Sequence, residues 1–290
     1  MRVGYLGPPG TFSHEALLPA EGVEPVEYPT LHATVLAVHD REVDRALVPI
    51  ENALEGSVSP TLDALAFATE DVVIVGELRH PVHHCLVARE SLGLEEIRTV
   101  VSHPQATGQC ARFLRESLPG AAVVAAASTA DAVRQVAASN PDPSPPAAGG
   151  ATAAGSSAAL GTAVAARLYG CVVLRENVED DPANETRFVW IAPAGAEPEP
   201  PEHGHWKTAL VFWGAGSAGP GWLVRCLSEF ASRGINLVRI ESRPRRQRLG
   251  EYMFFLDLEG AEADPDVAGA VAALREHADV VRVLGSFPAA

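Results

Sequence analysis

Residues 76–90 read GELRHPVHHCLVARE. This stretch is typical of a strand, but unlike the other β-like runs of the first 190 residues it is not followed by a polar loop and the start of a helix. We predict that this strand leaves one lobe of the protein and enters another. Residues 171–193, CVVLRENVEDDPANETRFVWIAP, are typical of a return path. Two such crossings predict two lobes with a cleft between them.

Around the crossings, the first 190 residues repeat a short β-like run, a small polar loop and a helix start. The run RALVPI, for example, leads into ENALEGSVS and then PTLDALAFA, where we expect Ser59 as the N-cap and Pro60 in the first helical position. This alternation predicts an α/β fold with largely parallel sheets. Ligands of such folds lie beyond the carboxyl ends of the strands.

Composition shifts predict two segments that interrupt this pattern, an insertion and a linker. Residues 140–157 are rich in Pro, Gly, Ala and Ser and predict a flexible insertion, while residues 194–204 are dense in Pro and Glu and predict a linker. We therefore expect a first domain at 1–193, with lobes at about 1–78 plus 178–193 and at 79–177. Residues 205–287 follow a βαββαβ order, a ferredoxin-like topology in which Asp264 and Pro265 start the second helix. The open face and edges of so small a sheet predict a homodimer or homotetramer.

The overall charge excludes some partners. A formal net charge of −15 argues against nucleic acid and against anionic membranes, because both need a sustained basic patch. The arginines at 243, 245, 246 and 248 form a short cluster that we interpret as a solvated hairpin edge. The sequence has no run of about 18 apolar residues and no signal-peptide pattern, which predicts a cytoplasmic protein.

Polar side chains gather at the predicted helix starts, where free backbone N–H groups favour anions. Each group taken alone is also explained by ordinary capping or a solvated loop. The stretch at residues 183–190, ANETRFVW, is by itself either the polar lead-in to a strand or the edge of a site. The dense histidines at 80–84 do not predict a metal site, because His83 and His84 are adjacent and point to opposite faces of a strand. We expect no metal and no cofactor.

Five motifs occur in one order along the chain: GPPGTFSHEAL, VPIENALEGSV, SHPQATGQC, STADAV and NETRFVWI. This series closely resembles that of the prephenate dehydratases, and INLVRIESRP within the βαββαβ segment resembles the ACT regulatory domain fused to them. The resemblance covers nearly the whole chain apart from the insertion and the linker. It implies a bilobal catalytic domain resembling type 2 periplasmic binding proteins, with the active site in the cleft.

The resemblance also implies a reaction, in which prephenate loses CO2 and water to give phenylpyruvate. Prephenate needs no external electron sink, because the electrons released by the leaving carboxylate expel the 4-hydroxyl and form an aromatic ring. Thr186 is implied to be essential as a hydrogen-bond donor to the leaving hydroxyl, with Glu51 as a candidate acid if burial raises its pKa. Arg187 either binds a carboxylate or only braces the loop. The implied substrate-binding residues are Thr11, Ser13, Asn52, Ser102, Gln105, Ser128, Thr129, Asn184 and Arg187.

For the C-terminal segment, the resemblance implies L-phenylalanine as an allosteric effector. The implied effector-binding residues are Thr208, Ala209, Leu210, Val211, Asn236, Glu241, Ser242, Arg243 and Pro244. Two positions depart from the pattern of many relatives: Ala53 replaces a serine and Thr208 replaces a glycine. An arogenate dehydratase and a two-lobed small-molecule sensor without catalysis remain the alternatives.

Overall fold

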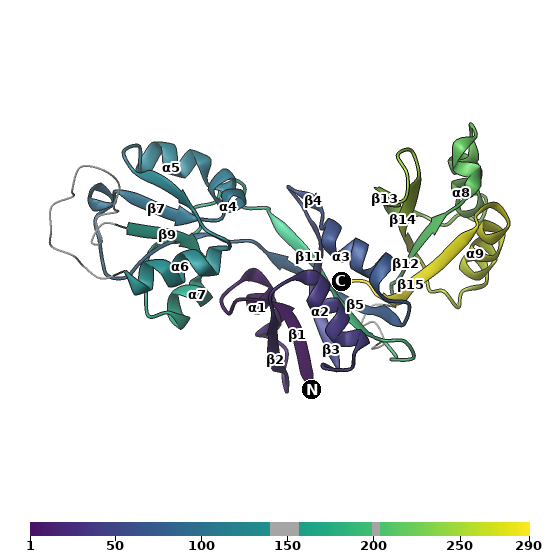
Figure 1. Ribbon diagram of the computed structural model, residues 1–290, viewed down its shortest axis with the longest axis horizontal. Helices are drawn as coiled ribbons and strands as arrows, with labels where there is room; N and C mark the ends of the chain where they lie inside the picture. Colours follow the sequence, from purple (N-terminus) through teal and green to yellow (C-terminus); the bar gives the residue numbers. More distant parts are fainter. Residues whose placement is uncertain (140–156, 199–203) are drawn as a thin grey trace.

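The computed structural model describes residues 1–139, 157–198 and 204–290 and shows an α/β chain (Figure 1). The predicted insertion, apart from Ser157, and part of the predicted linker lie outside these described residues. Three sheets organise the rest, and we call the parts built on them the first lobe, the second lobe and the C-terminal domain. Within these ranges, none of the helices combines the length and the apolar character needed to cross a membrane.

The first lobe is a mixed sheet in the order β2-β1-β3-β11-β5, with the short β4 paired to β3. Its strands are β1 (Arg2–Leu6), β2 (Glu24–Tyr28), β3 (Arg45–Asn52), β4 (Gly56–Ser57), β5 (Val72–Pro81) and β11 (Glu185–Pro193). Its helices are α1 (Phe12–Leu17), α2 (Leu31–His39), α3 (Ser59–Asp63) and the π-helical turn η1 (Ala64–Ala68). The predicted positions of Ser59 and Pro60 are each wrong by one residue, since Val58 is the N-cap, Ser59 is the first helical residue and Pro60 is the second.

The second lobe is a five-stranded sheet in the order β10-β6-β9-β7-β8. Its strands are β6 (Cys85–Ala88), β7 (Thr99–Ser102), β8 (Ala122–Ala125), β9 (Ser157–Gly161) and β10 (Val172–Arg175). Its helices are η2 (Leu94–Glu96), α4 (Pro104–Gln109), α5 (Ala111–Ser117), α6 (Thr129–Ala138) and α7 (Ala163–Leu168).

The two crossings between the lobes are confirmed, since the chain passes from β5 to β6 and returns from β10 to β11 (Figure 1). The prediction of largely parallel sheets holds for β1, β2 and β3 and for β7, β8 and β9. It is wrong at the crossings, where β11 is antiparallel to both β3 and β5, and β6 is antiparallel to both β9 and β10. The reason is the chain path: a strand that arrives from the other lobe enters its sheet from the opposite end.

The C-terminal domain has the predicted βαββαβ order, with the antiparallel sheet β13-β14-β12-β15. Its elements are β12 (Trp206–Trp213), η3 (Ala215–Ala218), α8 (Trp222–Ala231), β13 (Leu237–Pro244), β14 (Tyr252–Glu259), α9 (Pro265–His277) and β15 (Val280–Pro288). Asp264 and Pro265 begin α9 as predicted, at the N-cap and the first helical position. Leu210, Phe212 and Leu256 are buried among the residues of α8 and α9, which cover one face of the sheet.

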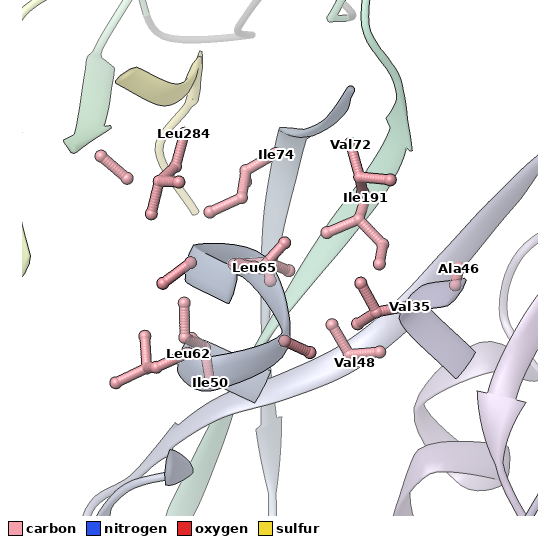
Figure 2. Close-up of a cluster of buried hydrophobic side chains, with 14 of the residues drawn as sticks. Val35, Ala46, Val48, Ile50, Leu62, Leu65, Val72, Ile74, Ile191 and Leu284 are labelled. Carbon is pink, nitrogen blue, oxygen red and sulfur yellow. The ribbon is translucent and has the colours of Figure 1, made fainter. Parts of the chain in front are cut away.

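The other face of this sheet packs against the first lobe, so the prediction of an open face is wrong. Successive residues of a strand point to opposite faces. The side chains of Ala209, Val211 and Phe255 therefore point away from the helices. They form one continuous core with Leu62 and Ile74 of the first lobe. Leu284 of β15 lies beside Ile74 in this core (Figure 2). The C-terminal domain consequently lies on the side of the first lobe that faces away from the second lobe (Figure 1).

The basic cluster near β13 is also less exposed than predicted. Arg243 and Arg246 form ion pairs with Asp63 of α3, at 2.8 Å in the case of Arg243. Arg245 lies over the Trp213 ring, 5.4 Å from its centroid. The cluster therefore joins the C-terminal domain to the first lobe, and only in part forms a solvated edge.

The backbones of β15 and β5 approach each other closely at Gly285. A Cβ added at Gly285 would lie 2.1 Å from the backbone oxygen of Ile74, and the residue has a φ of +153°. We predict that Gly285→Ala lowers the free energy of unfolding by at least about 2 kcal/mol, because the two strands must separate. Urea denaturation followed by circular dichroism measures this.

Gly250→Ala is the matched control, because Gly250 also has a positive φ of +88° but nothing lies near its added Cβ. Backbone strain alone predicts a loss of about 1 kcal/mol there. Equal losses in the two variants would contradict the close approach of β15 to β5.

Candidate active site

A cleft of about 320 Å³ lies between the two lobes. Its walls come from β3 and β11 of the first lobe and from the starts of α1, α4 and α6, so the predicted convergence of helix starts is present. The sequence-predicted residues that line it are Thr11, Ser13, Asn52, Gln105, Ser128, Thr129 and Thr186. Among the described residues that form its walls there is no arginine and no lysine.

The polar residues at these helix starts both cap the helix and face the cleft. The Thr11 hydroxyl accepts a hydrogen bond from the His14 N–H at 3.4 Å, and the Ser128 hydroxyl accepts one from the Asp131 N–H at 3.0 Å. The His103 Nδ1 atom accepts one from the Gln105 N–H at 3.3 Å. The sequence left open whether the polar residues of these loops cap a helix or face a ligand site. The structure shows that one residue can cap its helix and line the cleft at the same time.

The orientation of the Asn52 side chain follows from its backbone partners. Its Oδ1 atom accepts hydrogen bonds from the N–H groups of Leu54 and Glu55, both at 3.0 Å. The amide nitrogen must therefore point the other way, where it donates to the Thr186 hydroxyl oxygen at 2.9 Å. Because this oxygen accepts from Asn52, the hydrogen of the Thr186 hydroxyl is free to point into the cleft.

The same donor and acceptor order continues into the second lobe. Asn52 also donates to Asn184 Oδ1 at 3.0 Å, so the Asn184 nitrogen donates to Gln109 Oε1 at 3.3 Å. That oxygen lies 2.9 Å from His84 Nε2, which must then carry a hydrogen. A chain of side chains thus runs across the cleft and fixes the tautomer of His84.

His84 is a neutral group in this arrangement. Its side chain is buried and its ring lies nearly perpendicular to that of Phe12, with the ring centroids 5.3 Å apart. Burial lowers the pKa of His84, and this effect exceeds the opposing effects of the Gln109 hydrogen bond and the Glu179 charge. Its Nδ1 atom is buried and has no hydrogen-bond partner among the residues that the structure describes. The neighbouring His83 contacts Glu179 at 2.8 Å, so the two imidazoles have different partners; both residues lie in the connection between β5 and β6 and not within a strand.

Four predicted site residues do not line the cleft. Asn184 is buried behind Asn52, and the hydroxyl of Ser102 is buried and donates to the Leu160 carbonyl at 3.0 Å. Glu51 and Arg187 lie on the face of the β3–β11 pair that is turned away from the cleft, where they form an ion pair at 3.4 Å. The expectations that Arg187 holds a substrate carboxylate and that Glu51 acts as the acid do not fit this geometry, because neighbours of Thr186 and Asn52 in a strand must face the opposite side. The alternative in which Arg187 braces the strand fits.

The cleft also contains residues that the sequence argument missed. Gln109 lies four residues after Gln105 on the same short helix, a spacing that places both on one face. That spacing was a usable signal within SHPQATGQC. His84, Phe12 and Phe188 also line the cleft, but no local pattern separates them from core residues.

The predicted effector residues lie on β12, on β13 and in the turn before β13. Residues 208–211 are buried in β12, where the Thr208 hydroxyl donates to the Gly260 carbonyl at 2.8 Å. Asn236 is exposed. On β13, the Glu241 carboxylate accepts from the Ser57 hydroxyl at 3.1 Å and Arg243 donates to Asp63 at 2.8 Å. Ser242 and Pro244 pair with Phe254 and Tyr252 of β14.

Comparison with protein families gives two matches. The family described as prephenate dehydratase matches residues 3–196, and the ACT domain matches residues 220–276. A prephenate dehydratase of Amycolatopsis methanolica is 42% identical over 289 residues, which cover 99% of this chain and 88% of that relative. Arogenate dehydratase 1 of Petunia hybrida is 36% identical over 99% of this chain and 67% of that relative.

Among solved structures, the crystal structure of a prephenate dehydratase from Arthrobacter aurescens in complex with L-Phe is similar over the whole chain. It superposes with a TM-score of 0.86 at 34% identity, covering 100% of this chain and 90% of the other. The match includes both lobes and the C-terminal domain.

The lowered pKa of His84 predicts a pH effect on stability. The unfolded chain binds a proton at this imidazole at higher pH than the folded chain does, so the stability present above the unfolded pKa of about 6.5 is lost as pH falls through the folded pKa. We predict that the difference in unfolding free energy between the wild type and His84→Gln shrinks between pH 7.5 and pH 5.5. Urea denaturation at both pH values measures it, and a difference that grows on acidification would contradict a neutral His84.

Proposed function

This chain belongs to the prephenate dehydratase family, and we propose that the cleft between its lobes is the active site. The reaction is the decarboxylating dehydration of prephenate to phenylpyruvate, carbon dioxide and water, which belongs to phenylalanine biosynthesis. We assign catalysis to the domain at residues 1–193 and regulation to the ACT domain at residues 205–287, joined by the linker at 194–204.

The observation that carries the assignment is the hydrogen bond from Asn52 to Thr186. Since Asn52 occupies one lone pair of the hydroxyl oxygen, the Thr186 O–H is held as a donor towards the cleft. A donor there stabilises the negative charge that develops on the departing 4-hydroxyl of prephenate. The hydroxyl is too weak an acid to be the final proton source, so its role is electrostatic stabilisation of the leaving oxygen.

The substrate carboxylates are bound by neutral groups in this proposal. The cleft offers the hydroxyls of Thr11, Ser13, Ser128 and Thr129 and the amide of Gln105, together with the N–H groups at the start of α6. Gln109 joins this set, because its oxygen accepts from Asn184 and His84 and its amide hydrogens are left to donate. Fixed dipoles of this kind hold the substrate in the orientation from which it loses CO2 and hydroxide together.

Arogenate is the alternative substrate, because it differs from prephenate only in an amino group that replaces the side-chain keto group. The values of kcat/KM for the two substrates decide between them. A sensor without catalysis would bind prephenate in the same cleft and show no turnover in the wild-type protein.

Thr186→Ala tests the catalytic assignment. We predict a loss of kcat of roughly 10²- to 10³-fold, since removal of one donor to a developing oxyanion has this effect in other enzymes. Thr186→Ser keeps the hydroxyl and is expected to remain within about tenfold of the wild type. The assay follows phenylpyruvate by its absorbance in alkali, and a fully active Thr186→Ala variant would remove the proposed role.

Phenylalanine is the effector that we propose for the ACT domain. Support comes from the family match and from the similar Arthrobacter aurescens structure, which was crystallised with L-Phe. We assign its binding to Asn236, to residues 241–244 and to the strand at 208–211. The exposed Val238 and Ile240 on the edge strand β13 support pairing of two ACT domains in a homodimer or homotetramer.

Inhibition by phenylalanine tests this assignment. We predict that phenylalanine at millimolar or lower concentration reduces turnover of prephenate and that Asn236→Ala raises the concentration needed for half-inhibition. Asn236 is exposed, so the substitution should leave the fold intact. An unchanged response in Asn236→Ala would place the effector elsewhere.

A further inference from the structure

The pairing of β3 with β11 presents one pair of residues to the cleft and the next pair to the C-terminal domain. Thr186 lies opposite Asn52 and Arg187 lies opposite Glu51. Thr186 and Asn52 line the cleft, whereas Arg187 and Glu51 form their ion pair on the other face. Thr186, which carries the reactive hydroxyl, is therefore adjacent in the sequence to Arg187. Asn52, which donates to that hydroxyl, is adjacent to Glu51.

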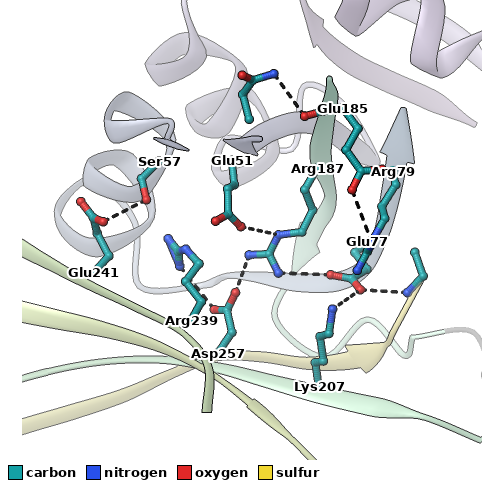
Figure 3. Close-up of polar contacts among 12 residues, drawn as sticks. Glu51, Ser57, Glu77, Arg79, Glu185, Arg187, Lys207, Arg239, Glu241 and Asp257 are labelled. Carbon is teal, nitrogen blue, oxygen red and sulfur yellow. Dashed lines mark hydrogen bonds and ion pairs between the residues drawn. The ribbon is translucent and has the colours of Figure 1, made fainter. Parts of the chain in front are cut away.

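Arg187 is held by carboxylates from three strands. Besides Glu51 of β3, its guanidinium donates to Glu77 of β5 at 3.2 Å and to Asp257 of β14 (Figure 3). The side chains of Glu77 and Asp257 are 0% and 2% exposed. Burial lowers the pKa of Arg187, but the charges of Asp257, Glu77 and Glu51 outweigh this effect and raise the pKa above its usual value. The guanidinium is therefore a permanent charge in a nearly closed site.

Asp257 brings the C-terminal domain into this arrangement. Its second oxygen lies 3.5 Å from Arg239 of β13, while Glu77 accepts from Lys207 of β12 at 2.6 Å (Figure 3). We call these residues the interdomain charge cluster; its members are Glu51, Glu77, Arg187, Lys207, Arg239 and Asp257. Three carboxylates balance three cations, so loss of any one leaves a buried charge uncompensated.

The ion pairs of Arg187 lie beside an irregularity in the pairing of β11 with β3. The register shifts between Arg187 and Phe188, where Ile50 of β3 is passed over, whereas β11 pairs with β5 without a shift from Glu185 to Trp190. A bulge of this kind interrupts the hydrogen bonds between two strands and changes the direction of the side chains beside it. The contact between Asn52 and Thr186 therefore lies next to an interrupted stretch of the β3–β11 pairing, and the ion pair between Arg187 and Glu51 adds a side-chain link between the same two strands.

We propose that Asp257 of the C-terminal domain is a positioning residue for the dehydration: through Arg187 it holds β11 so that the Thr186 hydroxyl is aimed into the cleft. This inference rests on the proposed catalytic role of Thr186. Asp257 itself lies on the far face of β11 from the cleft and does not contact the substrate. Its effect is expected in kcat, because a misaimed donor weakens the transition state more than the bound substrate.

A substitution at Asp63 serves as the matched control, because it weakens the contact between the first lobe and the C-terminal domain at a different place. Asp63 too is a buried carboxylate that joins the first lobe to the C-terminal domain, through Arg243 and Arg246. It lies on α3, and none of its ion pairs involves Arg187 or another member of the interdomain charge cluster. A variant at Asp63 therefore weakens the interface without releasing β11.

Steady-state kinetics on the full-length chain with prephenate test the proposal. Asp257→Asn is expected to lower kcat by roughly 10- to 100-fold, as misplacement of a catalytic group by about 1 Å does, with KM within about threefold of the wild type. Asp63→Asn is expected to keep kcat within about threefold. A wild-type kcat in Asp257→Asn, or an equal loss in Asp63→Asn, would overturn the proposal.

A second pair of variants keeps the test decisive if Asp257→Asn does not fold, which circular dichroism reports. Asp257→Glu and Asp63→Glu retain the negative charge but move the carboxylate by one methylene. We expect a kcat for Asp257→Glu between those of the wild type and Asp257→Asn, and an unchanged kcat for Asp63→Glu; equal values for the two would reject the proposal. Absence of turnover in the wild type would instead refute the proposed function.

Discussion

The antiparallel pairing of β3 with β11 is the constraint on which the other features of this protein depend. It closes the first lobe after the chain returns from the second, and it places Asn52 opposite Thr186. One face of the pair forms a wall of the cleft, and the other carries Arg187 and Glu51 towards the C-terminal domain. Because neighbouring side chains of a strand point to opposite faces, the cleft receives Thr186 and the domain interface receives Arg187, which are consecutive residues of β11.

The two faces of this pair differ in their electrostatics. The far face concentrates charge, with three cations and three carboxylates in the interdomain charge cluster, of which all but Glu51 are largely buried. The cleft has hydroxyls, amides and neutral imidazole, and its described lining has no arginine or lysine. Under the proposed function, a dianionic substrate in a chain of net charge −15 is bound by oriented dipoles, whose positions must be accurate because their field falls off steeply. The proposed positioning of Thr186 through Arg187 and Asp257 meets this requirement.

Sequence reasoning was most successful where the physical cause is local. Capping at Thr11 and Ser128 depends on a few neighbouring backbone groups, so the helix starts were predicted and do line the cleft. It was undecided or wrong where the cause is distant. For Arg187, the resemblance left open whether the side chain binds a carboxylate or braces the loop, because its partners Glu77 and Asp257 are 110 and 70 residues away along the chain. The covered face of the C-terminal sheet was missed for the same reason, since its apolar residues match a core that the first lobe supplies.

The sequence by itself determined the α/β fold class, the two crossings, the βαββαβ domain and the order of motifs that leads to the family. The fold class, the crossings and the βαββαβ order follow from local propensity, periodicity and spacing, which a single chain carries in full, whereas the family follows from the resemblance of the motifs. Only the tertiary structure decided which polar residues meet. Asn52 lies 134 residues from Thr186 along the chain, and Asp257 lies 70 residues from Arg187. Hydrogen bonds and buried ion pairs act over a few ångströms, so their partners are fixed by strand register and domain packing, not by distance along the sequence.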